Sequence, residues 1–261
     1  MPTHRFYARP ENFSADETLI TLAHEEAHHL CAVLRLREGA EVFVFDGCGR
    51  EFRCIVSAIE KRSGIALLKI EEEVLPTRPE SPLRLALALA LLKGEKFDLV
   101  VQKATELGVT RITPLLTRFS DIKMADPRDA ARRVARWRRL AIEAAKQSGR
   151  ARVPEVADPT GFAEFIENER RAADGGGFAR RLPIIFAERA GRDLREIRSR
   201  HDPKPQIITA VVGPEGGWSE EEIRQASQKG WEIVTLGGRT LRAETAAIVA
   251  VALLQHLYGD L

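Results

Sequence analysis

A proline-rich stretch divides the chain into two parts whose sequence patterns differ. Its prolines are Pro76, Pro79 and Pro82. Proline has a fixed φ and no backbone N–H, so it is excluded from helix interiors and central strands. We therefore predict a linker over residues 76–82. A chain of 261 residues is long enough for one domain on each side of this linker. The predicted domains cover residues 1–75 and 83–261.

The first part has the pattern of a small β-barrel. Residues 41–45 form a predicted strand, and residues 51–56 alternate charged and apolar side chains as its return strand. Asp46-Gly47 joins them, and Asp-Gly supplies the positive φ that a hairpin turn needs. A third strand is predicted at 65–70 and one helix at 24–34. Several short strands joined by turns are typical of a barrel.

After the linker, buried strands alternate with helices. Strands are predicted at 83–92, 112–116, 182–187, 207–212 and 233–236. Helices are predicted at 96–107, 127–149, 219–229 and 243–258. Asp126 is the predicted N-cap of the second helix, and Ser219 with Glu222 makes a capping box for the third. This alternation indicates an α/β domain with a mainly parallel sheet. Residues 169–181 are predicted to form a mobile surface loop.

Composition excludes several classes of protein. Apolar residues make up 44% of the chain and charged residues 30%, a mixture that can bury a core. No apolar run approaches the ~20 residues that cross a bilayer, and no signal peptide is evident, so we expect a cytoplasmic protein without a membrane partner. The cysteines form no CxxC pair, and His28 and His29 are adjacent rather than at metal-ligand spacing. We expect no metal site.

Charge is distributed unevenly although the net charge is only +2. Residues 128–152 contain eight arginines and Lys146, against Asp129 and Glu143. This stretch is either a solvated helix face or an RNA-phosphate contact, and the balanced charge elsewhere favours RNA. A second, weaker cluster lies in the first part. The predicted RNA-binding residues are Arg5, Arg9, Arg35, Arg37, Lys93, Lys96, Arg132, Arg136, Arg139 and Arg150. Trp137 falls on the apolar stripe of its helix and is a predicted core residue.

Two glycine-rich loops follow two predicted strands late in the chain, at 212–219 and 236–245. Ligands bind at the carboxyl ends of strands in open α/β sheets, and glycine lets the backbone approach a ligand closely. Neither loop matches a Walker A or GxGxxG motif. Each loop alone is compatible with a tight turn before a helix. Together, with Arg239, Arg242 and Glu244 in the second loop, they favour one shared pocket.

These two loops carry a specific resemblance. Gly-Pro-Glu-Gly-Gly at 213–217, followed by Leu-Gly-x-Arg-x-Leu-Arg-x-Glu-Thr-Ala at 236–246, resembles the signature of the RsmE family of SPOUT-superfamily RNA methyltransferases. Residues 4–7, 92–96, 102–108 and 143–150 also resemble stretches of that family. Lys146 and Thr240 depart from the family pattern, which has an acid and an aliphatic residue there.

The resemblance implies a trefoil-knotted C-terminal α/β domain and a PUA-like N-terminal β-barrel domain that binds RNA. It implies S-adenosyl-L-methionine as cofactor, N3 of a uridine in small-subunit (16S) ribosomal RNA as methyl acceptor, and RNA or a ribosomal particle as partner. It also implies a homodimer with its active site at the subunit interface. By matching positions, the donor pocket is expected to be lined by Gly213, Pro214, Glu215, Gly216, Gly217, Leu236, Gly237, Arg239, Leu241, Thr245 and Ala246.

Methylation at N3 requires that the base be unpaired and that N3 lose its proton. Arg242 is the candidate group that stabilises the resulting negative charge, since arginine stays protonated. Glu244 would orient Arg242 or accept the proton. The alternative for these two residues is an ion pair at a helix start. Two other functions stay open, namely an RNA-binding module without activity and an enzyme that binds a nucleotide phosphate, although Glu215 disfavours a phosphate.

Overall fold

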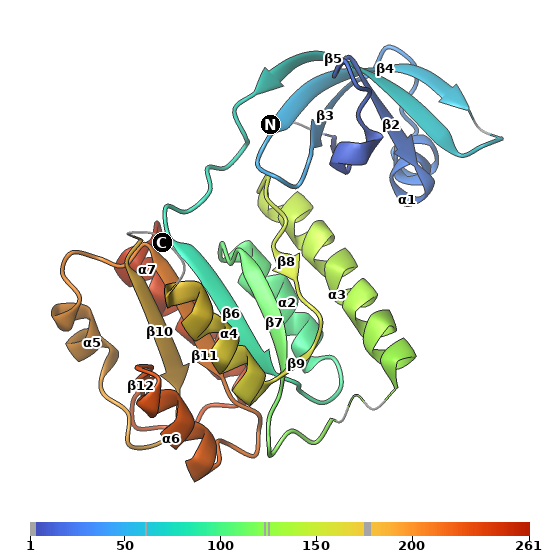
Figure 1. The fold of residues 1–261 in the computed structure, drawn as a ribbon. Coiled ribbons are helices and arrows are strands. Elements are labelled where there is room, and N and C mark those ends of the chain that lie inside the picture. The colour runs from blue at the N-terminus through green and yellow to red at the C-terminus, as the bar shows by residue number, and fades with distance from the viewer. Residues whose placement is uncertain (1–3, 61, 123, 125, 175–178) are drawn as a thin grey trace. The chain divides into compact units, whose positions relative to one another are not determined.

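The computed structural model describes residues 4–60, 62–122, 124, 126–174 and 179–261 (Figure 1). The chain forms two compact units. Unit 1 contains the residues up to Glu80 together with 142–153, and unit 2 contains residues 81–141 and 154–261. Residues 142–153, which the sequence pattern assigns to the second domain, therefore pack with the first unit.

Unit 1 is built on a five-stranded sheet in the order β1-β3-β4-β5-β2. The strands are β1 (Arg5–Tyr7), β2 (Leu19–Ala23), β3 (Glu41–Phe45), β4 (Glu51–Glu60) and β5 (Ile65–Val74). β1 is parallel to β3, and the other neighbours are antiparallel. The three predicted strands are confirmed, and β4 and β5 are longer than predicted. The predicted helix is α1 (His24–His28), continued by a π-helical turn, His29–Val33. A 3-10 turn, Pro10–Asn12, follows β1.

The hairpin between β3 and β4 follows the prediction. Asp46 accepts hydrogen bonds from the backbone N–H groups of Cys48, Gly49 and Arg50, at 2.7, 3.0 and 3.1 Å. Gly47 has a φ of 77°, the left-handed conformation that glycine adopts without strain. The carboxylate thus satisfies three donors of the turn.

Helix α3 (Pro127–Ser148) contributes its last turns to unit 1. The guanidinium of Arg5 donates to the carbonyls of Ala145, Lys146 and Arg150, at 3.3, 3.3 and 2.8 Å. Ala145 and Lys146 lie in the last turn of the helix, where carbonyls lack intrahelical partners, and the Ala145 carbonyl also accepts the N–H of Arg150 at 3.0 Å. Lys146 forms an ion pair of 2.9 Å with Glu26 of α1. The lysine that departs from the family pattern therefore has a structural partner.

Unit 2 contains a seven-stranded parallel sheet in the order β12-β10-β11-β6-β7-β8, with β9 also paired to β7. The strands are β6 (Arg84–Ala90), β7 (Arg111–Leu116), β8 (Glu155–Val156), β9 (Thr160–Gly161), β10 (Arg181–Phe186), β11 (Ile207–Val212) and β12 (Glu232–Val234). The prediction of an α/β domain with a mainly parallel sheet is confirmed. β6, β10 and β11 are apolar along their length because helices cover both faces.

Among the described residues, five helices belong wholly to unit 2: α2 (Lys96–Glu106), α4 (Phe162–Asp174), α5 (Leu194–Arg200), α6 (Glu220–Gln228) and α7 (Ala243–Tyr258). α4 and α6 lie on one face of the sheet and α2 and α7 on the other (Figure 1). The capping box of Ser219 and Glu222 is confirmed. The predicted cap of α3 is also confirmed, because the Asp126 carboxylate accepts the N–H of Arg128 at 2.9 Å.

One predicted loop is wrong in part. Residues 169–174 of the stretch 169–181 belong to α4, and Arg181 begins β10. The helix forms because Phe162, Phe165 and Ile166 follow the spacing of one helix face and are buried against the sheet. The glycines of the predicted loop lie outside the described residues.

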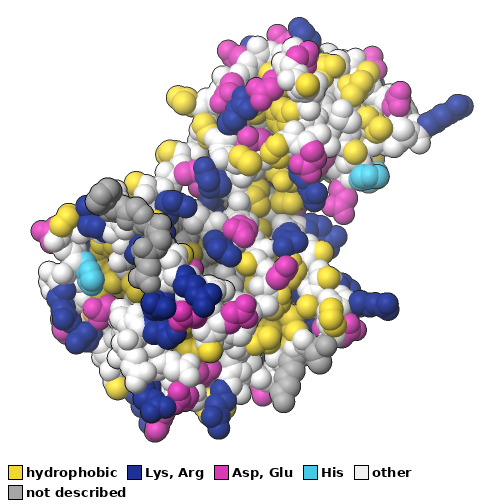
Figure 2. Space-filling model, in the orientation of Figure 1, with side chains coloured by type: hydrophobic (Ala, Val, Ile, Leu, Met, Phe, Trp, Pro, Cys, Tyr) yellow, Lys and Arg dark blue, Asp and Glu magenta, His cyan; other side chains and the backbone are white. Residues whose placement is uncertain are grey.

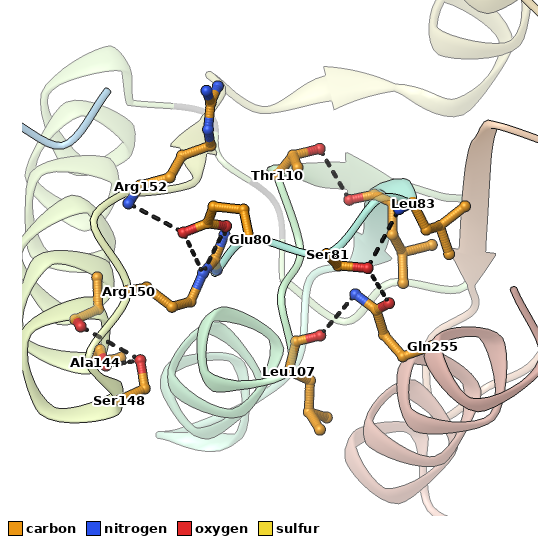
Figure 3. A network of polar contacts seen from close by, with 12 residues as sticks. Glu80, Ser81, Leu83, Leu107, Thr110, Ala144, Ser148, Arg150, Arg152 and Gln255 are labelled. Atoms are coloured by element: carbon orange, nitrogen blue, oxygen red, sulfur yellow. Dashed lines mark hydrogen bonds and ion pairs between the residues drawn. The ribbon is translucent and has the colours of Figure 1, made fainter. Parts of the chain in front are cut away.

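A buried amide joins distant parts of unit 2. Gln255 of α7 is fully buried; its Nε2 donates to the carbonyl of Leu107 at 2.9 Å, and its Oε1 accepts the hydroxyl of Ser81 at 2.8 Å (Figure 3). Gly108 has a φ of 86°, and a β-carbon there would lie 2.7 Å from Nε2 of Gln255. None of the helices in the described part of the chain is long and apolar enough to cross a membrane.

Candidate functional site

A cavity of unit 2 lies where β10, β11 and β12 end. It has a volume of about 420 Å³, and Phe186, Val212 and Thr235 at or just after these strand ends contribute to its wall. The two glycine-rich loops form the rest, since they follow β11 and β12. A volume of this size and a position at the carboxyl ends of parallel strands are typical of a small-molecule site.

Most of the residues predicted to bind the donor meet in this cavity. Those that line it are Gly213, Pro214, Glu215, Gly217, Leu236, Gly237, Arg239, Leu241 and Ala246. Arg242 lines it as well. Gly216, Thr245 and Glu244 do not belong to the lining. The two loops therefore share one pocket, as their pattern suggests.

Gly216 has a packing role. A β-carbon at this position would lie 3.0 Å from Cβ of Phe119 and 3.1 Å from its carbonyl oxygen. The glycine therefore lets the first glycine loop pack directly on the loop that follows β7. The residues on either side, Glu215 and Gly217, face the cavity.

Several lining residues were not predicted. Ala187 and Glu188 follow β10, and Trp218, Gly238 and Thr240 complete the two glycine loops. The Glu188 carboxylate packs against Gly217: a β-carbon on Gly217 would lie 3.0 Å from both carboxylate oxygens. A charged residue directly after the buried strand at 182–187 is a signal of such a position, because side chains there face the carboxyl edge of the sheet.

A lysine bridges two carboxylates at the edge of the cavity. Lys96 Nζ lies 2.8 Å from Glu215 Oε1 and 3.7 Å from Glu244 Oε2. The hydrogen bond to Glu215 raises the pKa of Lys96. Partial burial raises the pKa of Glu215, but the bonds from Lys96 and from the backbone outweigh it, so this pKa lies below its ordinary value. Both groups are therefore charged at neutral pH.

Glu244 and Arg242 lie in different surroundings. Oε2 of Glu244 is buried and accepts no hydrogen bond from the described residues; its nearest cation is Lys96. Arg242 is the N-cap residue of α7 and is exposed at the cavity. No ion pair joins Arg242 to Glu244 among the described residues, so the alternative of a helix-start ion pair between them is not formed.

Two of the predicted RNA contacts are structural. The Arg5 side chain is 8% exposed, lies 2.6 Å from Glu51 and stacks on the Phe45 ring at 4.0 Å. Arg150 is 4% exposed and forms a 2.7 Å ion pair with Glu80, which also accepts the N–H of Arg152 (Figure 3). The guanidinium groups of Arg5 and Arg150 are largely buried and already paired with carboxylates, which disfavours the interpretation of these two residues as RNA contacts.

The remaining predicted RNA contacts are exposed, except Lys96, which is partly buried and paired with Glu215. In unit 1, Arg9, Arg35 and Arg37 are exposed, and Arg9 is 3.6 Å from Glu11. In unit 2, three of the exposed cations predicted to contact RNA form ion pairs with acidic side chains. Basic and acidic side chains are interspersed on the face of the molecule that Figure 2 shows. Those pairs are Lys93–Asp121, Arg132–Asp129 and Arg136–Asp98, while Arg139 is also exposed. Surface pairs of this kind are weak, so these cations can exchange partners.

A second hollow of about 320 Å³ lies between α2 and α3 and is lined by Arg132, Arg133 and Arg136. Trp137 borders it and is confirmed as a core residue, 3% exposed. Its ring packs on Phe97 with centroids 4.2 Å apart, and its Nε1 donates to Asp98 at 2.9 Å. No group of three potential metal ligands occurs among the residues that the structure describes.

Comparison with known proteins relates both parts of the chain to one family. Residues 79–255 match the family described as "RNA methyltransferase domain", and residues 22–69 match "RNA methyltransferase PUA domain". Ribosomal RNA small subunit methyltransferase E of Synechocystis sp. is 33% identical over 97% of this chain and 78% of its own length. The protein of the same name from Bacillus subtilis is 30% identical over 90% of this chain and 91% of its own.

Solved structures agree. A ribosomal RNA small subunit methyltransferase E from Neisseria gonorrhoeae, bound to S-adenosyl methionine, superposes with a TM-score of 0.82 at 35% identity, over 100% of this chain and 99% of that one. A methyltransferase from Legionella pneumophila, in complex with the same cofactor, gives a TM-score of 0.84 at 32% identity over the whole of both chains. With a family match over most of its length and full-length relatives above 30% identity, the chain belongs to the ribosomal RNA small subunit methyltransferase E family, RsmE.

Proposed function

We propose that this protein transfers a methyl group from S-adenosyl-L-methionine to N3 of a uridine in small-subunit (16S) ribosomal RNA. The observation that carries the proposal is the single cavity built by both glycine loops in a chain of the RsmE family. The substrate is free RNA or an assembling ribosomal particle, and the cytoplasm is the proposed compartment because ribosomal RNA is found there.

The residues of the cavity fit the donor. Glycine at 213, 217 and 237 leaves backbone amides and carbonyls open to a ligand. Leu236 and Leu241 offer apolar contact for an adenine ring, and the Glu188 carboxylate can accept hydrogen bonds from ribose hydroxyls. When bound, the donor supplies a methyl group already activated on a sulfonium.

The protein must then make the acceptor nitrogen nucleophilic. Arg242, exposed at the cavity, is the proposed stabiliser of negative charge on the uracil ring. Glu244 is the proposed proton acceptor, because its buried Oε2 has no hydrogen-bond donor among the described residues. Lys96, 3.7 Å away, keeps that carboxylate close to the pocket edge and ties it to Glu215.

The RNA is held by exposed cations in both units. We assign this role to Arg9, Arg35, Arg37, Lys93, Arg132, Arg136 and Arg139. Because such contacts release counterions from the phosphate backbone, affinity for RNA is expected to fall steeply with salt.

We also propose a homodimer. One face of α7 is buried in unit 2, while Ile248, Val249, Ala252 and Leu253 on its other face are partly exposed. An apolar face of this kind on a helix that begins at the pocket fits an interface with a second copy. A cation from the partner subunit would then reach the active site.

The direct test is methyl transfer to ribosomal RNA. Purified protein, labelled donor and undermethylated small subunits or their RNA are expected to yield N3-methyluridine by nucleoside mass spectrometry. RNA binding without methyl transfer would favour the alternative of an RNA-binding module that has no enzymatic activity. Thermal stabilisation by ATP rather than by S-adenosylhomocysteine would favour a nucleotide-binding enzyme. Either result would contradict the proposal.

A further inference from the structure

We infer that Phe119, together with Arg118, forms a stacking platform for an unpaired base of the substrate RNA beside the donor pocket. This inference deepens the proposed function and rests on it. Neither residue belongs to the two glycine loops or to the cavity lining.

The ring is unusually accessible for an aromatic side chain. Phe119 is 46% exposed, although it follows β7, whose residues Ile112 and Leu115 are fully buried. The Arg118 guanidinium lies 5.9 Å from the centroid of the ring and is itself exposed. An apolar ring and a planar cation side by side are the chemistry that binds nucleobases, through stacking and attraction to the RNA backbone.

The loop that presents the ring is held in place. The hydroxyls of Thr117 and Ser120 are 2.7 Å apart, and the N–H of Thr117 donates to Ser120 at 3.3 Å. The N–H of Arg118 donates to the buried carboxylate of Glu222 at 2.9 Å. A preorganised ring loses little conformational entropy when a base stacks on it.

The residue that carries the ring also contacts the wall of the donor pocket. Gly216 packs on Phe119 so closely that a β-carbon would lie 3.0 Å from the Cβ atom of the phenylalanine. Glu215 and Gly217, the neighbours of Gly216, line the pocket. The platform is thus attached directly to the loop whose neighbouring residues would hold the donor. Since N3 lies on the pairing edge, the target must leave its helix, and stacking compensates for lost base stacking.

The test compares Phe119→Leu, which keeps an apolar contact for Gly216 but removes the π-face, with Phe119→Trp, which keeps it. We expect Phe119→Leu to bind a single-stranded substrate RNA about 5- to 100-fold more weakly and Phe119→Trp to bind it nearly as wild type. Leu75→Ala is the control, because Leu75 is a 93% exposed apolar residue of unit 1. Titration with S-adenosylhomocysteine is expected to give the same affinity for all four proteins.

A fluorescent base gives a direct reading. RNA with 2-aminopurine beside the target uridine is expected to be quenched on binding to wild type and Phe119→Trp and to stay bright with Phe119→Leu. Unchanged RNA affinity in Phe119→Leu, or a loss of donor affinity equal to the loss of RNA affinity, would overturn the inference while wild-type transfer still upholds the proposed function. Absence of transfer by the wild type would instead overturn the proposed function.

Discussion

Substitution of Arg242 tests whether this side chain stabilises charge in the reaction or only helps to bind the donor. The Arg242 side chain is exposed at the cavity and forms no ion pair with any of the described residues. We expect Arg242→Ala to lower the methyl-transfer rate by about 10²–10³ with little change in donor affinity. Arg242→Lys is expected to recover only part of the rate, because an ammonium lacks the planar fork of a guanidinium. Single-turnover rates and donor titrations measure both; a near-normal rate for Arg242→Ala would leave Glu244 as the main candidate.

The Lys96–Glu215 pair gives a pH dependence with a defined sign. The pKa of Glu215 lies below its ordinary value of 4.5. A carboxyl group with a lowered folded-state pKa stabilises the fold above its unfolded pKa, and that contribution is lost as pH falls through the folded pKa. We expect Lys96→Met to melt at a lower temperature than wild type near neutral pH, and the difference to vanish in acid. A difference that persists below the folded pKa would show that packing of the lysine stem, rather than its charge, matters.

Residue types were predictable here and burial was not. The glycines and charged residues of the two loops are visible as a pattern, and most of them meet in the cavity. Arg5 and Arg150 are arginines in basic surroundings, as RNA contacts are, yet they are buried against Glu51 and Glu80. These partners lie 46 and 70 residues away, and no local pattern encodes such a pairing.

Helix α6 depends on its first turn. Glu222 accepts hydrogen bonds from the N–H and hydroxyl of Ser219 and from the N–H of Arg118. We expect Ser219→Ala to cost about 1 kcal/mol, the usual value of an N-cap. Glu222→Ala is expected to cost more, because three donors lose their acceptor. Urea unfolding measures the stability of both variants. Glu221→Ala is the control, because it removes only a carboxylate that forms an exposed ion pair with Arg224. Equal stability of Glu222→Ala and Glu221→Ala would show that the loop after β7 does not depend on α6.

The exposed face of α7 tests the proposed dimer. Leu253 is 36% exposed on this helix. A charge buried in an apolar interface is costly, so Leu253→Glu is expected to shift the protein toward a single chain of 29.1 kDa by light scattering. Leu261→Glu, at a 60% exposed position outside the helix, is expected to leave the mass unchanged. A wild-type particle of one chain's mass would contradict the dimer itself.

Long periodic elements were predicted well, and short ones were missed. α7 begins and ends as predicted because its apolar residues and its flanking glycine are unambiguous. β1, β8 and β9 have two or three residues each, too few for a period to appear. The knot implied by the family resemblance is a property of the path of the whole chain, so residue spacing does not encode it.

Neither unit of the molecule is one continuous segment. A fragment of residues 83–261 would keep both glycine loops but would strip 142–153 of Glu80, Arg5 and the Phe45 packing cluster. We expect this fragment to bind S-adenosylhomocysteine, to melt below the whole chain and to bind RNA poorly. Calorimetry and RNA anisotropy measure these properties. RNA methylation by the fragment at the wild-type rate would show that unit 1 is dispensable.

The strand order of unit 2 also determines when the enzyme becomes active during its own synthesis. β6 is translated early, but its neighbour β11 and the two glycine loops of the cavity come from residues after 206. A growing chain on the ribosome therefore carries the N-terminal barrel strands long before it can hold a donor. The cavity is complete only once residues 236–246, which lead into α7, have been made.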